Sequence, residues 1–175
     1  MNDRYETGLY RYRPEAEAAV ERLNALGYAR DDISVVMDDK TREQAFAGEV
    51  GAKTGEGIAT GSVAGGVLGA IVGAATATGS VAVIAGTGGL AAPFVVGPLV
   101  GALAGLGVGG AAGGIVGGLI GLGVGESRAK AYEKGIKEGG ILIAVKPKSG
   151  HEEKLREALR DQYDTAYAGD TNRLN

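Results

Sequence analysis

The chain of 175 residues contains no cysteine and no tryptophan, and His151 is its one histidine. Without cysteine the protein can form neither a disulfide nor a thiolate metal site, and one histidine excludes a multi-histidine metal site within a single chain. The lack of cysteine fits a reducing, cytoplasmic environment.

Charge is missing from the middle of the chain. The 69 residues between Glu56 and Glu126 include no charged side chain, so the 18 Lys and Arg and the 21 Asp and Glu all lie in the flanks. The net charge of −3 is small and evenly mixed, and no basic run with interleaved aromatic residues is present. Nucleic acid is therefore not an expected partner.

The N-terminus lacks an apolar segment after its first charged residues, because residues 1–23 read MNDRYETGLYRYRPEAEAAVERL. This pattern matches neither a secretory signal nor a transit peptide. If the protein enters a membrane, its uncharged middle must carry it there.

The N-terminal flank predicts a strand, a helix and a second strand. Residues 6–13 carry aromatic and aliphatic side chains in rough alternation, which favours a strand that ends at Pro14. Residues 14–26 favour an amphipathic helix, because apolar side chains recur there at steps of three and four, namely Ala16, Ala19, Val20, Leu23 and Leu26. Residues 32–38 predict the next strand, and 39–56 are either a polar connector or a helical extension.

The C-terminal flank predicts a helix, a strand and a helix. Residues 126–140 place apolar side chains at helical steps and end in two glycines, with the apolar positions at Ala129, Tyr132 and Ile136. Residues 141–147 form a short apolar run typical of a buried strand. The pair Ser149 and Glu152 has the spacing of a capping box and predicts a last helix over about 150–163.

The two flanks together predict an α+β fold, a small ferredoxin-like (split βαβ) module interrupted by a Gly-rich α-helical hairpin. Neither flank alone has enough apolar surface for a core, so the two must close on each other across the insertion. Residues 38 and 126 must then lie near one another, which requires the apolar segments between them to run out and back an even number of times. The expected divisions are 1–56 for the first half of the module, 57–125 for the hairpin, 126–164 for the second half and 165–175 for a flexible tail.

Glycines recur at every fourth position of the uncharged block, in two files. A spacing of four returns to nearly the same helix face, so each file forms a groove along which another helix can approach closely, a glycine zipper. The predicted helix-packing residues are Gly57, Gly61, Gly65, Gly69, Gly73, Gly97, Gly101, Gly105, Gly109, Gly113, Gly117, Gly121 and Gly125.

The block permits two interpretations. As helices, residues 57–77 and 97–125 are about 30 and 43 Å long, which is enough to cross a bilayer as a hairpin. The Lys and Arg residues near both ends then place both termini in the cytoplasm and the hairpin in a bacterial inner membrane. Because Gly and Ala dominate, insertion of either helix alone is marginal, and the alternative is a cytoplasmic protein whose block is buried by self-association.

Several short motifs are better explained by structural roles than by ligand binding or catalysis. The G-x-G-x-x-G pattern at 105–110 follows from the glycine content, and 48–54 lacks the glycine that precedes the lysine of a phosphate loop. Other candidates read as turn, cap or sheet-packing residues, namely Asp31, Asp32, Asp38, Asp39, His151, Tyr5, Tyr10, Tyr12 and Tyr28. We expect no catalytic, cofactor-binding or metal site, and no enzyme.

The order of several segments resembles the bacterial heat and general stress proteins, typified by the general stress protein 17M-like domain. The resemblance covers about residues 5–147 and rests on segments 15–23, 26–28 and 31–36, on Gly97-Pro98-Leu99, and on 131–133 and 137–145. It implies a small stress-induced protein with an α/β domain, a glycine-zipper insertion and no established enzymatic activity. The chain departs from the family in spacing around Glu126-Ser127-Arg128.

From these patterns we expect a non-enzymatic general stress-response protein that is membrane-associated through a self-associating glycine-zipper hairpin. Its expected partners are further copies of itself in a homo-oligomer and a lipid bilayer. The alternative is a soluble self-assembling scaffold or binding module whose Gly/Ala-rich helices form the core of a homo-oligomer.

Overall fold

The computed structural model describes residues 4–46, 66–78, 81–83, 93–101 and 114–160. Its elements follow the chain in this order: β1 (Glu6–Tyr10), α1 (Arg13–Ala25), the 3-10 turn η1 (Arg30–Asp32), β2 (Ile33–Met37), α2 (Asp39–Phe46), α4 (Gly66–Thr78), β3 (Val81–Val83), β4 (Phe94–Val96), α6 (Ile115–Gly121), α7 (Glu126–Lys137), β5 (Ile141–Val145) and α8 (Glu152–Ala158).

The strands form one five-stranded sheet in the order β1-β5-β2-β4-β3, with every neighbouring pair antiparallel. Strand β5 lies between β1 and β2, so that Ile143 is opposite Gly8 on one side and opposite Val35 on the other. The connected strands β1 and β2 are thus separated by a strand from the other flank. This arrangement is the predicted split βαβ unit, and the α+β class is confirmed.

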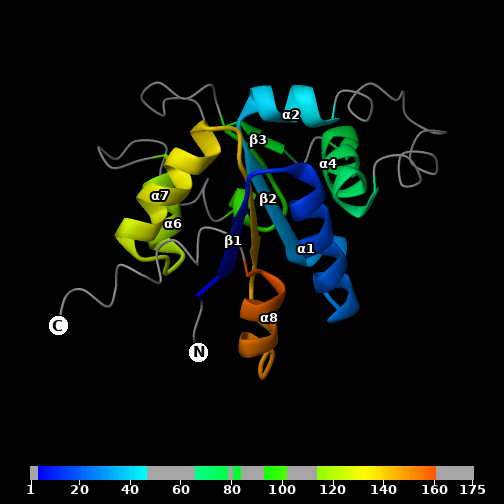
Figure 1. The fold of residues 1–175 in the computed structure, drawn as a ribbon, viewed down its shortest axis with the longest axis vertical. Coiled ribbons are helices and arrows are strands. Elements are labelled where there is room, and N and C mark those ends of the chain that lie inside the picture. The colour runs from blue at the N-terminus through cyan, green and yellow to red at the C-terminus, as the bar shows by residue number, and fades with distance from the viewer. Residues whose placement is uncertain (1–3, 47–65, 79–80, 84–92, 102–113, 161–175) are drawn as a thin grey trace.

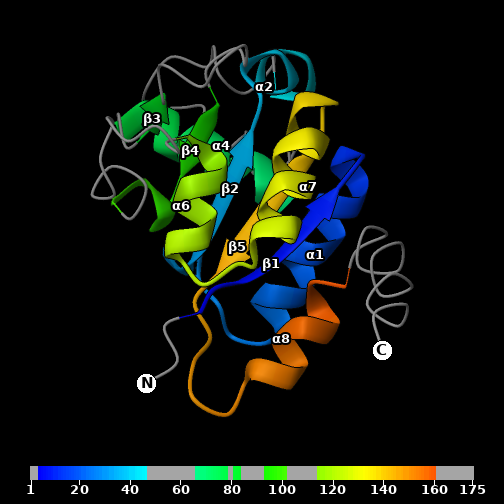
Figure 2. The ribbon, with the colours of Figure 1, turned by 90° about the vertical axis from the view of Figure 1, so that its left-hand side faces the viewer.

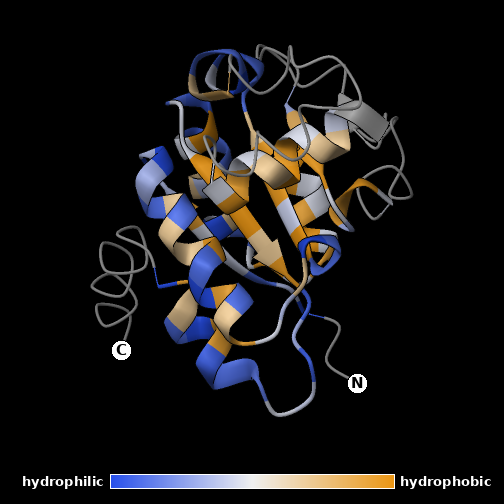
Figure 3. Ribbon diagram, turned by 90° about the vertical axis from the view of Figure 1, so that its right-hand side faces the viewer, coloured by the Kyte–Doolittle hydropathy of each residue, from blue (hydrophilic) through white to orange (hydrophobic). Residues whose placement is uncertain are grey.

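Helices cover both faces of the sheet, as Figures 1 and 2 show. Helices α1, α4 and α8 pack on one face, and α6 and α7 pack on the other. The alternation of strand side chains accounts for the two layers: Ile143 of β5 belongs to the first core, and its neighbours Leu142 and Ala144 belong to the second. Strands β2, β4 and β5 are mostly apolar, whereas the helices that cover the sheet carry hydrophilic residues as well (Figure 3).

Helix α1 forms where the spacing predicts it. Its buried side chains form one stripe, Ala16, Ala19, Val20 and Leu23, and Pro14 lies in its first turn. The chain leaves the helix at Gly27, whose φ of +84° is a conformation that glycine adopts without strain. The polar segment that follows β2 begins with helix α2, which is one of the two alternatives for that segment.

The second flank also matches its expected element order, with one difference at α8. Helix α7 begins at Glu126 and β5 is buried along its whole length. Helix α8 begins at Glu152, and its N-cap is His151, without a hydrogen bond from the side chain. The predicted capping box of Ser149 and Glu152 is therefore wrong, because the helix starts two residues later than the box requires.

The described part of the glycine-rich block contains two strands that the sequence analysis missed. Strand β4 pairs with β2, β3 pairs with β4, and both extend the sheet. A continuous helix over 97–125 is wrong, because Gly97, Gly114 and Gly123 have φ values of +87°, +92° and +86°. Of the expected helix over 57–77, the structure describes α4, whose 13 residues extend about 20 Å.

Membrane-spanning helices were expected in the block. Across the described ranges, no helix combines the length and the apolar composition that crossing a bilayer requires.

Candidate functional site: the seam between the glycine-rich block and the flanks

The described part of the glycine-rich block meets the flanks along a seam that includes an apolar surface and polar contacts made by two flank side chains, Glu17 and Ser34. The first polar contact joins α1 to α4. Oε1 of Glu17 accepts a hydrogen bond from the backbone N–H of Leu68 at 2.8 Å, and the carboxylate also accepts from the backbone of Val67. Both donors lie in the first turn of α4, where backbone N–H groups have no partner inside the helix. Glu17 therefore caps a helix that is remote in sequence.

The backbone of α4 is shaped around this carboxylate. Gly66 has a φ of +66°, and a Cβ atom placed there would lie 2.6 Å from Cδ of Glu17. A residue with a side chain would therefore displace Glu17 or distort the start of the helix. The positive end of the α4 dipole also favours a negative charge at this point.

Burial opposes that charge. Desolvation raises the pKa of Glu17 above its ordinary value, and the hydrogen bonds from Leu68 and Val67 lower it by less. Among neighbouring charges, Arg13 lowers the pKa and Glu21 raises it. The Glu17 carboxylate is therefore held by specific donors at a position where its charge is only partly solvated.

The second polar contact joins β2 to the segment after β4. Oγ of Ser34, which is fully buried, accepts a hydrogen bond from the backbone N–H of Leu99 at 3.1 Å. The chain approaches β2 closely here, because a Cβ on Gly97 would meet the carbonyl oxygen of Ile33 and would lie 2.8 Å from Cα of Ser34. Leu99 itself is fully buried.

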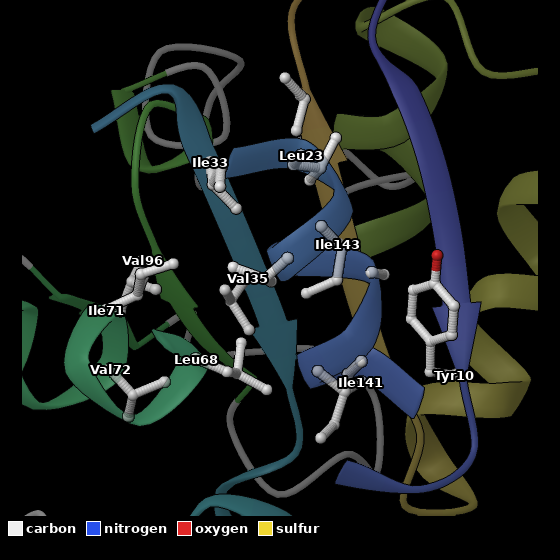
Figure 4. Close-up of a cluster of buried hydrophobic side chains, with 14 of the residues drawn as sticks. Tyr10, Leu23, Ile33, Val35, Leu68, Ile71, Val72, Val96, Ile141 and Ile143 are labelled. Atoms are coloured by element: carbon white, nitrogen blue, oxygen red, sulfur yellow. The ribbon is translucent and has the colours of Figure 1, made fainter. Parts of the chain in front are cut away.

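The apolar part of the seam lies between α4 and the sheet (Figure 4). Leu68, Ile71 and Val72 point from α4 into the core that α1 shares with β2, β4 and β5. On the opposite face, Ile115 and Leu119 of α6 join the core beneath α7. Each buried aliphatic side chain of this kind stabilises the fold by about 1.5–3 kcal/mol, so the block supplies a substantial part of the core.

The predicted helix-packing glycines fall in different environments. Gly69 is buried on α4 and Gly73 is half-buried. Gly117 is half-buried on α6, and Gly121 is exposed at its end. Gly97 serves the close approach to β2, whereas Gly101 and Gly125 are exposed, with open space where a Cβ would be. The others lie outside the described residues, namely Gly57, Gly61, Gly65, Gly105, Gly109 and Gly113. Packing of the files against one another stays a prediction.

A separate polar cluster joins the loop after α1 to the loop before α8. Nζ of Lys148 lies 2.9 Å from Oδ2 of Asp32 and 4.6 Å from the ring centroid of Tyr28, and it donates to the carbonyl of Gly27. The Tyr28 hydroxyl accepts from the Lys148 backbone N–H, and the His151 ring lies edge-on to Tyr28. The hydrogen bond from Lys148 lowers the pKa of Asp32. These contacts hold the two flanks together.

The remaining acidic candidates also have structural roles. Asp38 accepts from the backbone N–H of Lys40 at 2.8 Å, and Asp39 pairs with Arg42 on α2. Within the described ranges, no group of three or more His, Cys, Asp or Glu residues is placed to hold a metal ion. Among the four tyrosines that were assigned to packing, Tyr10 and Tyr28 are buried and Tyr12 is 59% exposed.

The roles of Glu17 and Ser34 in the seam were not predicted from the sequence. Glu17 lies one position from the buried face of α1 and has the appearance of an ordinary solvated glutamate. Ser34 is the one polar residue of the strand ISVVM, which is buried along its whole length. A hydroxyl inside such an apolar strand needs a hydrogen-bond partner, and this is the signal that could have identified Ser34.

Comparison with known proteins matches part of this arrangement. The model of the heat-induced stress protein YflT domain matches residues 6–88, from the start of β1 to just beyond β3. Comparison with curated proteins and with solved structures finds no match. The matched segment contains β1, α1, β2 and α4, and so includes the Glu17 contact of the seam. The resemblance seen in the sequence is thereby confirmed over residues 6–88, which match the model of the heat-induced stress protein YflT domain.

Proposed function

We propose that this stress protein is non-enzymatic and acts as a self-assembling scaffold, in which small-residue surfaces of the glycine-rich block pack against those of other copies. The observation that carries the proposal is how the side chains of the block are distributed between the core and the surface. Leu68, Ile71 and Val72 are turned into the core, while Ala70, Gly73 and Ala74 on α4 remain partly exposed.

A second uncharged surface is present around α6. Ile120 is 43% exposed, and its neighbour Gly121 is also exposed. Small residues permit close approach of two backbones, and the absence of charge means that no ion must be desolvated when copies meet. These features support contact between copies of the chain.

The same distribution of side chains favours assembly between copies rather than insertion as a membrane hairpin. A helix that faces lipid directs its large apolar side chains outward, because the surrounding tails are themselves apolar. On α4 the large aliphatic side chains contact α1 and the sheet instead.

Light scattering after size-exclusion chromatography tests the proposal. Gly101→Leu and Gly125→Leu add side chains where the single chain has open space, so the fold should persist while contact between copies is blocked. Ala25→Leu on the exposed side of α1 is the control. We expect the two glycine variants to lower the particle mass and the control to retain it. A wild type that is monomeric at every concentration, or glycine variants of unchanged mass, would overturn the proposal.

Fractionation of cells separates the scaffold from the membrane hairpin. After an alkaline carbonate wash, we expect the untagged full-length protein in the supernatant. Retention in the membrane pellet would instead favour an inserted block.

A further inference from the structure

We propose that Glu17 is a latch that holds α4 closed on α1 and the sheet, and that α4 opens as a separate unit when this latch is removed. The latch is the carboxylate that accepts hydrogen bonds from Leu68 and Val67 in the first turn of α4. It comes from α1, so it joins two helices whose contact residues are 51 positions apart in sequence.

The composition of α4 makes it dependent on such an external contact. Its sequence GVLGAIVGAATAT contains three glycines, which lower its helix propensity, and no charged residue, so it has no ion pairs along its length. Helix α7, of similar length, has three Lys–Glu pairs at a spacing of four. Helix α4 is held instead by one apolar face and by its capped N-terminus.

The position of α4 allows it to open without disrupting the sheet. It packs on α1 and reaches the sheet through β4, whereas β5, the strand that joins the two flanks, is paired on both sides by β1 and β2. Native proteins open locally in units of this kind, at free energies below that of global unfolding. Removing the latch should therefore expose α4 and leave the remaining core closed.

The absence of cysteine permits a direct test with single thiol reporters. Val72→Cys places a thiol on the buried face of α4, and Leu155→Cys places one on the buried face of α8 as the matched control. The rate of thiol labelling is measured in full-length protein with each reporter, with Glu17 intact and with Glu17→Ala. Each rate is normalised to that of the unfolded chain.

We expect Glu17→Ala to speed labelling at Val72→Cys about tenfold, the effect of losing a helix cap, and to leave labelling at Leu155→Cys unchanged. Glu17→Gln keeps an acceptor oxygen and should label no faster than the parent protein. An unchanged rate at Val72→Cys, or equal acceleration at both reporters, would overturn the latch.

Hydrogen exchange provides a second readout that requires no cysteine. In Glu17→Ala, we expect faster amide exchange across α4 and unchanged exchange across α7. Equal acceleration in both helices would show global destabilisation and reject the latch. Because the proposed assembly surface includes residues of α4, both readouts compare parent and variant at the same particle mass, as checked by light scattering. A change in labelling or exchange at equal mass then reports on the latch alone, so the latch and the proposed assembly fail separately.

Discussion

The hydroxyl of Ser34 and the backbone N–H of Leu99 are 3.1 Å apart and form a buried hydrogen bond between β2 and the segment after β4. Both residues belong to segments that carry the resemblance to stress proteins, although 65 positions separate them. The bond explains why a hydroxyl is present in a strand that is otherwise apolar: it satisfies an N–H group that the turn at Gly97 directs toward β2.

Replacing Ser34 by alanine should therefore destabilise the fold. The N–H of Leu99 would lose its partner in a buried environment, at a cost of about 1–3 kcal/mol in the free energy of unfolding. Urea denaturation measures the change, and exposed Ser149→Ala is the control, with an effect within about 0.5 kcal/mol. Equal stability of the two variants would contradict the importance of the bond.

Gly97 and Gly27 form a matched pair for testing the close approach of the block to β2. Both have strongly positive φ, +87° and +84°, but the Cβ position is crowded by β2 at Gly97 and open at Gly27. Gly27→Ala should cost about 1 kcal/mol for the backbone conformation alone. Gly97→Ala should cost about 3 kcal/mol, because β2 must also shift. Denaturation curves that give the same loss for both would exclude crowding.

Stability should depend on the ionisation of Glu17. Because its pKa is raised in the folded state, folding is favoured by its protonated form: this contribution is complete below the ordinary value of 4.5 and is lost as pH rises through the folded pKa. The free energy of unfolding of the wild type, minus that of Glu17→Gln, should therefore increase from neutral pH down to about 4.5. Urea titrations between these limits measure the difference, and a decrease toward acid would have the wrong sign.

Lys148 should control the ionisation of Asp32. Lys148→Met removes the hydrogen bond that lowers the pKa of Asp32, so this pKa should rise toward its ordinary value of 3.8, as measured by NMR titration. Loss of the exposed ion pair and of the contact with the Tyr28 ring should cost about 1 kcal/mol. The exposed Lys154→Met on α8 is the control. An unchanged Asp32 titration would show that the pair does not persist in solution.

The flanks of this fold could be predicted because their apolar patterns are local. The stripe on α1 and the continuous run in β5 each identify an element and its buried surface, and the need for two incomplete halves to close explains the split βαβ arrangement. In the glycine-rich block, Gly and Ala leave little periodic contrast. The sequence PFVVGP consequently gave no sign that it forms β4, which is specified by pairing with β2.

The seam could not be predicted, because its polar contacts join residues far apart in sequence. Glu17 differs from Glu21 on the same helix only in having the N-terminus of α4 beside it. The regular spacing of glycines likewise does not distinguish a position that packs against β2, such as Gly97, from one with open space, such as Gly101.

The position of β5 between β1 and β2 also limits the order in which the sheet can form as the protein is synthesised. Strands β1 and β2 emerge from the ribosome early, but the edge that each presents to β5 stays unpaired until residues 141–145 have been synthesised. Throughout that interval the nascent chain presents two apolar strand edges. The sheet can therefore be completed only after a late strand enters between two early ones, and residues 6–88 alone lack the strand that joins them.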